Sequence, residues 1–182
     1  LSSFSVDGDS TSIIKGAATY NYYGQMTSGS TPSKGAVTIT PAHGAASDGQ
    51  LSSIGVNEFL NFSYSFSQSF EINYSMSGEQ PNKVVFNEGS EELSIESIIS
   101  DIDFQKTSLT GSAGLCDSVD GFTERNGEIN LYNLCGNHVT DISVSGYLEE
   151  RTVSSSANSE VIESVTIRQK FVKDEGCQWV IV

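Results

Sequence analysis

The chain has 182 residues and a formal net charge of −14, and 37% of its residues are hydrophobic. This length is sufficient for one domain with its own core. The negative charge argues against nucleic acid and anionic membrane surfaces as partners, because both bind basic faces. No apolar run in the sequence has the length of a membrane-spanning helix.

Residues 1–12 are mostly polar, with Phe4 and Val6 as isolated apolar positions. Side chains two residues apart lie on the same side of a strand. We interpret the segment as an N-terminal arm that a second copy accepts as a donor strand, with Phe4 and Val6 filling pockets in that copy. An edge strand on its own domain is the alternative. Residues 13–182 are expected to form a single β-sandwich domain.

The segment 60–76 alternates between apolar and polar residues throughout, with only Gln68 breaking the apolar series. Successive side chains of a strand point to opposite faces, so this pattern predicts β-structure with one aromatic face and one serine-rich face. The aromatic face is expected to be buried through Phe62, Tyr64, Phe66, Phe70, Ile72 and Tyr74.

Two arrangements of this segment keep all its apolar side chains on one face. One is a single strand of about 58 Å. The other is a hairpin with a three-residue loop at 67–69, which pairs Phe66 with Phe70 and Tyr64 with Ile72. The sequence leaves both arrangements open, because the loop has no Gly or Asn to favour a tight turn.

Residues 90–104 carry the signals of a short helix. Ser90 is a suitable N-cap, Glu91 and Glu92 suit the first turn, and isoleucines follow at helical spacing at positions 95, 98, 99 and 102. We therefore predict a helix at 91–100 that runs into a strand.

The remaining segments favour strands at 129–134, 139–153, 161–172 and 177–182. Together these elements predict an all-β fold. The expected architecture is an antiparallel β-sandwich of jelly-roll or immunoglobulin-like type, or a barrel, with at most one short helix.

Three cysteines suggest a covalent link. Cys116 and Cys135 bracket a turn-rich segment, and a disulfide between them would stabilise the fold by roughly 3 kcal/mol. Cys177 would then be free or intermolecular, and pairing of Cys135 with Cys177 is the alternative. A disulfide implies an oxidising compartment. With a chain that begins at Leu1 rather than Met, this predicts an extracellular or cell-surface protein exported by a cleaved signal peptide.

Calcium is the candidate cofactor. Asp117, Asp120 and Glu124 lie in one glycine-containing loop, and hard cations prefer several oxygen ligands from such loops. The spacing differs from that of an EF-hand.

Two sequons, at Asn61 and Asn73, lie on the polar face of the alternating segment and are candidate glycosylation sites. A sugar-stacking platform could come from Tyr20, Tyr22, Tyr23 and Trp179, although aromatic side chains in strands usually pack in the core.

The sequence argues against catalysis. His43 and His138 are its only histidines, and the Gly-x-Ser-x-Gly motif is missing. No catalytic residues are predicted. The expected function is that of a non-enzymatic, secreted structural or adhesive protein, a subunit of a pilus-like extracellular filament that assembles by strand addition. A calcium-dependent carbohydrate-binding module is the alternative.

Overall fold

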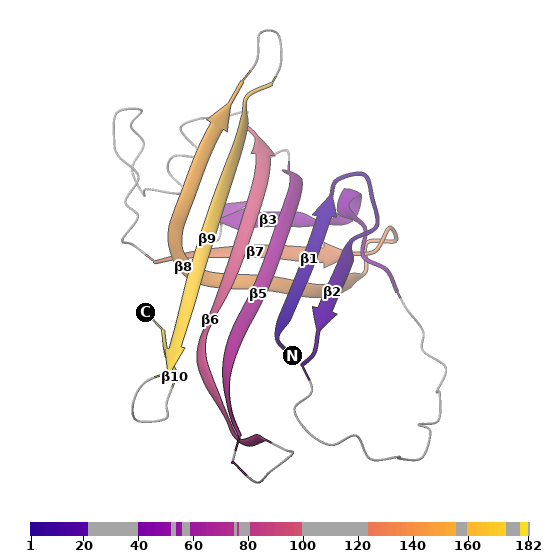
Figure 1. Ribbon diagram of the computed structural model, residues 1–182. Helices are drawn as coiled ribbons and strands as arrows, with labels where there is room; N and C mark the ends of the chain where they lie inside the picture. Colours follow the sequence, from indigo (N-terminus) through magenta and orange to yellow (C-terminus); the bar gives the residue numbers. More distant parts are fainter. Residues whose placement is uncertain are drawn as a thin grey trace.

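The computed structural model describes residues 1–21, 40–51, 54–55, 59–74, 76, 81–99, 124–155, 160–173 and 179–181. Their strands form one antiparallel sheet that curls into a half-barrel (Figure 1). The predicted all-β antiparallel class is confirmed. Within the described residues the only helical element is a single 3-10 turn, η1 (Gly44–Ala46).

The strands follow one another in the sheet in the order β2-β1-β5-β6-β9-β8-β7-β3-β4, and β10 pairs with β9. Their bounds are β1 (Ser3–Asp9), β2 (Lys15–Thr19), β3 (Asp48–Leu51), β4 (Ile54–Gly55), β5 (Phe59–Tyr74), β6 (Pro81–Ile98), β7 (Glu124–Tyr132), β8 (His138–Ser154), β9 (Ile162–Lys173) and β10 (Trp179–Ile181).

The alternating segment is one long strand rather than a hairpin. β5 continues through residues 67–69 and pairs with β6 on both sides of them, for example Phe66 with Glu91 and Phe70 with Phe86. The register shifts between Ser69 and Phe70, where Asn87 of β6 has no counterpart on β5. The hairpin alternative is wrong, because β6 already supplies hydrogen-bonding partners along the whole strand.

The predicted helix at 91–100 is also wrong. Residues 91–98 belong to β6 and pair with β5 on one side and β9 on the other. Leu93, Ile95 and Ser97 alternate as buried positions, which is the period of a strand. The β-branched isoleucines favour this conformation, and two neighbouring strands outweigh a capping signal that acts only locally.

The core lies between two layers of the curled sheet. In Figure 1, β1, β5, β6 and β9 form the front layer, and β3, β7 and the first part of β8 cross behind their upper part. The buried core residues come from both layers: Val6, Ala42, Leu51, Phe62, Leu93, Ile95, Ile129, Leu131, Val144, Val165 and Ile167. The contact between layers is close, since a Cβ on Gly127 of β7 would lie 2.9 Å from Leu93 Cδ2 of β6.

Backbone hydrogen bonds tie the layers together beside β1. Ile14 N donates to Ala42 O at 3.1 Å, and Gly44 N donates to Ser12 O at 3.0 Å. His43 N donates to Tyr132 O at 2.9 Å and so connects this segment to the end of β7. We call these three bonds the layer tie.

The N-terminal segment is an integral part of this sheet. β1 lies between β2 and β5, Val6 is buried, and Phe4 packs against the core cluster. Phe4 also contacts Tyr64 edge-on, with ring centroids 6.0 Å apart. Both residues therefore complete the core of their own chain, and their exchange with a neighbouring copy stays a prediction.

Candidate functional site

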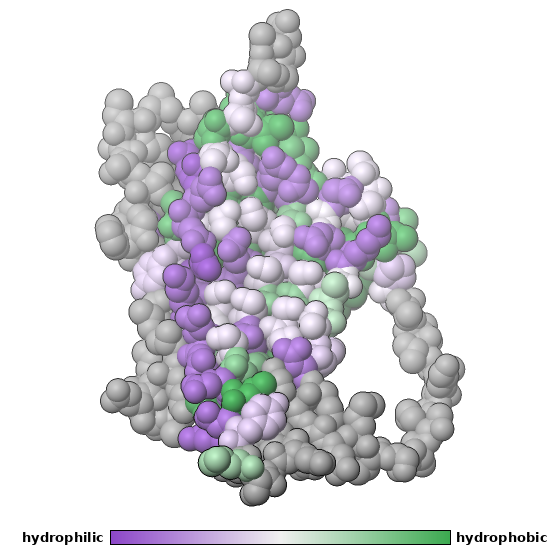
Figure 2. Space-filling model, in the orientation of Figure 1, coloured by the Kyte–Doolittle hydropathy of each residue, from purple (hydrophilic) through white to green (hydrophobic). Residues whose placement is uncertain are grey.

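The outer face of the front layer carries rows of small polar side chains. Every second residue of β5 points outward, so Ser63, Ser65, Ser67 and Ser69 form one row. They pair with outward residues of β1 and β6, among them Ser3, Ser5, Ser90 and Ser94. We call this surface the serine face, and it forms much of the pale and purple surface in Figure 2.

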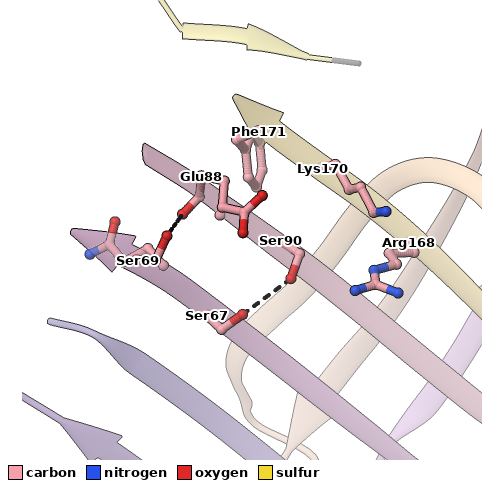
Figure 3. Close-up of a pocket in the computed structure, with 9 residues that line it drawn as sticks. Ser67, Ser69, Glu88, Ser90, Arg168, Lys170 and Phe171 are labelled. Atoms are coloured by element: carbon pink, nitrogen blue, oxygen red, sulfur yellow. Dashed lines mark hydrogen bonds between the residues drawn. The ribbon is translucent and has the colours of Figure 1, made fainter. Parts of the chain in front are cut away.

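A hollow of about 390 Å³ opens in this surface where β5, β6 and β9 lie side by side. Its lining includes hydroxyl and charged side chains (Figure 3), and the lining residues are Ser67, Gln68, Ser69, Glu88, Gly89, Ser90, Arg168, Lys170 and Phe171. The long-range register brings them together, because Ser67 pairs with Ser90, and Ser90 pairs with Lys170.

The hydroxyls in the hollow are only partly used. Ser67 Oγ and Ser90 Oγ share one hydrogen bond of 3.1 Å, and Ser69 Oγ donates to Glu88 O at 3.4 Å. Each hydroxyl offers one donor and two acceptor positions. Hydrogen-bonding capacity therefore remains for a molecule that enters the hollow.

A second, smaller hollow of about 180 Å³ lies on the other side of Arg168 and Lys170. It is lined by these two residues and by Tyr147, Leu148 and Glu149 of β8. Arg168 Nη1 donates to Glu149 Oε1 at 2.6 Å, and this bond raises the pKa of the guanidinium above its ordinary value. The Nε of Arg168 is buried without a hydrogen-bond partner.

A buried ion pair lies on the opposite, inner face of the sheet. Glu163 is only 1% exposed, and its Oε1 accepts a hydrogen bond from Arg151 Nε. Its Oε2 has no hydrogen-bond partner. Glu163 is surrounded by paired strands, with Ser97 of β6 on one side and Val153 of β8 on the other, which indicates a structural role.

The two histidines do not meet in either hollow. His43 Nδ1 accepts from Ala45 N at 3.2 Å and caps η1. His138 lies at the start of β8, where its Nε2 is 2.5 Å from Asp141 Oδ1 and its ring contacts Tyr132. The hollows therefore present groups suited to binding, without a histidine beside a serine nucleophile.

The predicted calcium ligands fall mostly outside the described residues. Asp117 and Asp120 are in that part of the chain, and Glu124 is the exposed first residue of β7. In the part that the structure describes, no three His, Cys, Asp or Glu side chains gather where they could hold a metal ion. The calcium site stays a prediction.

The cysteine and sequon predictions are placed only in part. Cys135 is exposed in the turn between β7 and β8, while Cys116 and Cys177 lie outside the described residues, so the disulfide stays a prediction. Asn73 is exposed on β5. Asn61 is half-buried and donates to the Glu96 carboxylate, so Asn73 is the more accessible acceptor.

The proposed aromatic platform is not assembled by the described residues. Tyr20 is exposed just after β2, Trp179 begins β10, and Tyr22 and Tyr23 lie outside the described part. The sequence singled out neither Tyr147 nor the pair Arg168 and Lys170 as site residues. Their alternation with Val165 and Ile167 was a visible signal, but which strands lie beside them was not.

No family model, no curated protein and no solved structure matches the chain. The described part of the chain contains no helix that is long and apolar enough to cross a membrane.

Proposed function

We propose that this is a non-enzymatic structural or adhesive protein of the cell exterior whose copies associate by strand addition at the edge of the sheet. The observation that carries the proposal is β2. This strand ends the sheet on one side, and all five of its residues, Lys15 to Thr19, are exposed. Among the described strands only β1 pairs with it, which leaves one side of its backbone available.

An edge strand of this kind is a template for pairing with another chain, because its outward N–H and C=O groups have no ladder to join. The residues Gly16, Ala17 and Ala18 present little side-chain bulk to an approaching strand. The opposite end of the sheet is the two-residue strand β4, a much shorter template. We therefore assign the contact to β2, instead of to a donated segment 1–12.

Adjacent residues of a strand direct their N–H groups to opposite sides, and this provides a matched pair of variants. One of Ala17→Pro and Ala18→Pro removes a donor that faces the open edge, and the other removes a donor that faces β1. The first should abolish association and leave the melting temperature nearly unchanged. The second should lower the melting temperature.

Sedimentation velocity of the full chain and both variants, with negative-stain microscopy for filaments, measures the association. The proposal fails if the full chain is monomeric at high concentration. It also fails if both proline variants associate as the unmodified chain does.

A further inference from the structure

We propose that the serine face carries a binding groove for a neutral oligosaccharide, formed by the two hollows on either side of Arg168 and Lys170. The inference goes beyond assembly, because these hollows lie over interior strands and leave the β2 edge free.

The groove has the extent of a short linear ligand. It crosses β5, β6, β9 and β8, which are consecutive neighbours in the sheet. Four strands at the usual spacing span roughly 14 Å. Phe171 lines one hollow, and Tyr147, which is 41% exposed, lines the other. The ring of Tyr147, which pairs with Arg168 on the outer face, offers an apolar surface to the C–H face of a sugar ring.

The polar lining matches the chemistry of vicinal hydroxyls, which both donate and accept. Ser67, Ser69 and Ser90 can do either. Lys170 is an exposed donor, and the Glu88 carboxylate is an acceptor, with no ion-pair partner for either among the described residues. The buried Nε of Arg168 is a further unsatisfied donor beside both hollows, of the kind that an ordered water or ligand oxygen commonly satisfies.

The charges in the groove select a neutral ligand. Arg168 and Lys170 are balanced by Glu88 and Glu149, which line the same two hollows. Around this balanced groove the chain carries a net charge of −14, which repels an anionic glycan.

A peptide is a poorer match for the groove than a sugar. Ser67, Ser90 and Arg168 lie on strand segments that are paired on both sides, so the centre of the groove offers an extended peptide no open backbone edge. A ligand must instead be recognised by side chains alone, through hydroxyls, charges and ring faces.

The test is isothermal titration calorimetry of the full chain with cello-, malto-, chito-, xylo- and mannohexaose, and with hexagalacturonate as the acidic comparison. Lys170→Ala and Tyr147→Ala should each weaken binding of the preferred neutral hexasaccharide by about tenfold, the effect of losing one good contact. Lys15→Ala and Tyr20→Ala, exposed residues of the same types away from the groove, should leave the affinity unchanged.

The proposal is overturned if no neutral hexasaccharide binds, if hexagalacturonate is preferred, or if the two groove variants bind as well as their controls. Sedimentation of the same variants reports on strand addition separately, so a failure of sugar binding is distinguishable from a failure of assembly.

Discussion

The two ends of β5 have the same sequence pattern and different surroundings. Near its start Phe62 is 2% exposed, whereas near its end Tyr74 is 62% exposed, although both belong to one uninterrupted alternation. Phe62 belongs to the same core cluster as Leu51 of β3 and Ile129 of β7, and Figure 1 shows these strands crossing behind the front layer. Between these ends Tyr64, Phe66, Phe70 and Ile72 are half-buried.

This difference separates two properties that an alternating sequence combines. Alternation is a property of the strand and fixes which side chains share a face. Burial depends on the layer that covers that face, and the second layer covers only part of the front strands. The predicted burial of Phe62 is confirmed, and that of Tyr74 is wrong because its end of β5 extends beyond the core residues.

The largest effect is expected from Phe62→Ala. This change removes a ring from the covered part of the core and should lower the free energy of unfolding by about 3–5 kcal/mol. Tyr74→Ala should change it by less than about 0.5 kcal/mol, as exposed positions usually do. Chemical denaturation measures both. Equal losses in the two variants would show that both ends of β5 are covered, contrary to the comparison.

The fold was readable from the sequence wherever the signal is local. The alternation of 60–76 is strong enough to give the strand and its two faces before any partner is known. At 91–98 the local signals conflict, because the cap at Ser90 and the spacing of the isoleucines suit a helix while Leu93, Ile95 and Ser97 suit a strand. Pairing with β5 and β9 decided the outcome, and no local window contains those strands.

The candidate groove could not be predicted from the sequence, for a related reason. Ser67 and Lys170 are about a hundred positions apart along the chain, and they line one hollow only because β6 lies between β5 and β9. Sheet order is set by packing and by loops, so residue types alone gave a polar face without its neighbours. The acidic loop, by contrast, attracted notice by composition, and most of it lies outside the described residues.

A smaller loss of stability is expected from a substitution at the layer tie, near the covered end of β5. A Cβ on Gly44 would lie 1.7 Å from the Asp9 carbonyl oxygen, a backbone atom that cannot rotate away. Gly44→Ala should therefore cost about 1–3 kcal/mol. Amide hydrogen exchange should show lost protection around Phe62 before Ile72.

Gly16→Ala is the matched control for this change. Its Cβ would be 3.3 Å from Ser5 O, a contact that a small shift accommodates. If Gly44→Ala is as stable as this control, the layer tie does not hold the second layer in place.

The smallest change in stability is expected in the turn after β1, next to the layer tie. Hydrogen bonds from the Ser12 hydroxyl, the Thr11 hydroxyl and the Thr11 N–H lower the pKa of Asp9 from 3.8 to about 2. Because the folded-state pKa is the lower one, the ionised carboxylate stabilises the turn above pH 4 or so. That contribution decreases as the pH falls from about 4 through about 2.

Between about pH 5 and about pH 2, the melting temperature of Asp9→Asn should therefore fall by less than that of the unmodified chain. The two curves of melting temperature against pH should converge at the acidic end. The exposed position of Asp9 keeps the difference small. A Thr11→Val, Ser12→Ala double variant retains the carboxyl group but removes its hydroxyl donors, so its acid dependence should resemble that of Asp9→Asn. Parallel curves for Asp9→Asn and the unmodified chain would mean that the turn's hydrogen bonds contribute nothing to stability, and the layer tie would then depend on its backbone bonds alone.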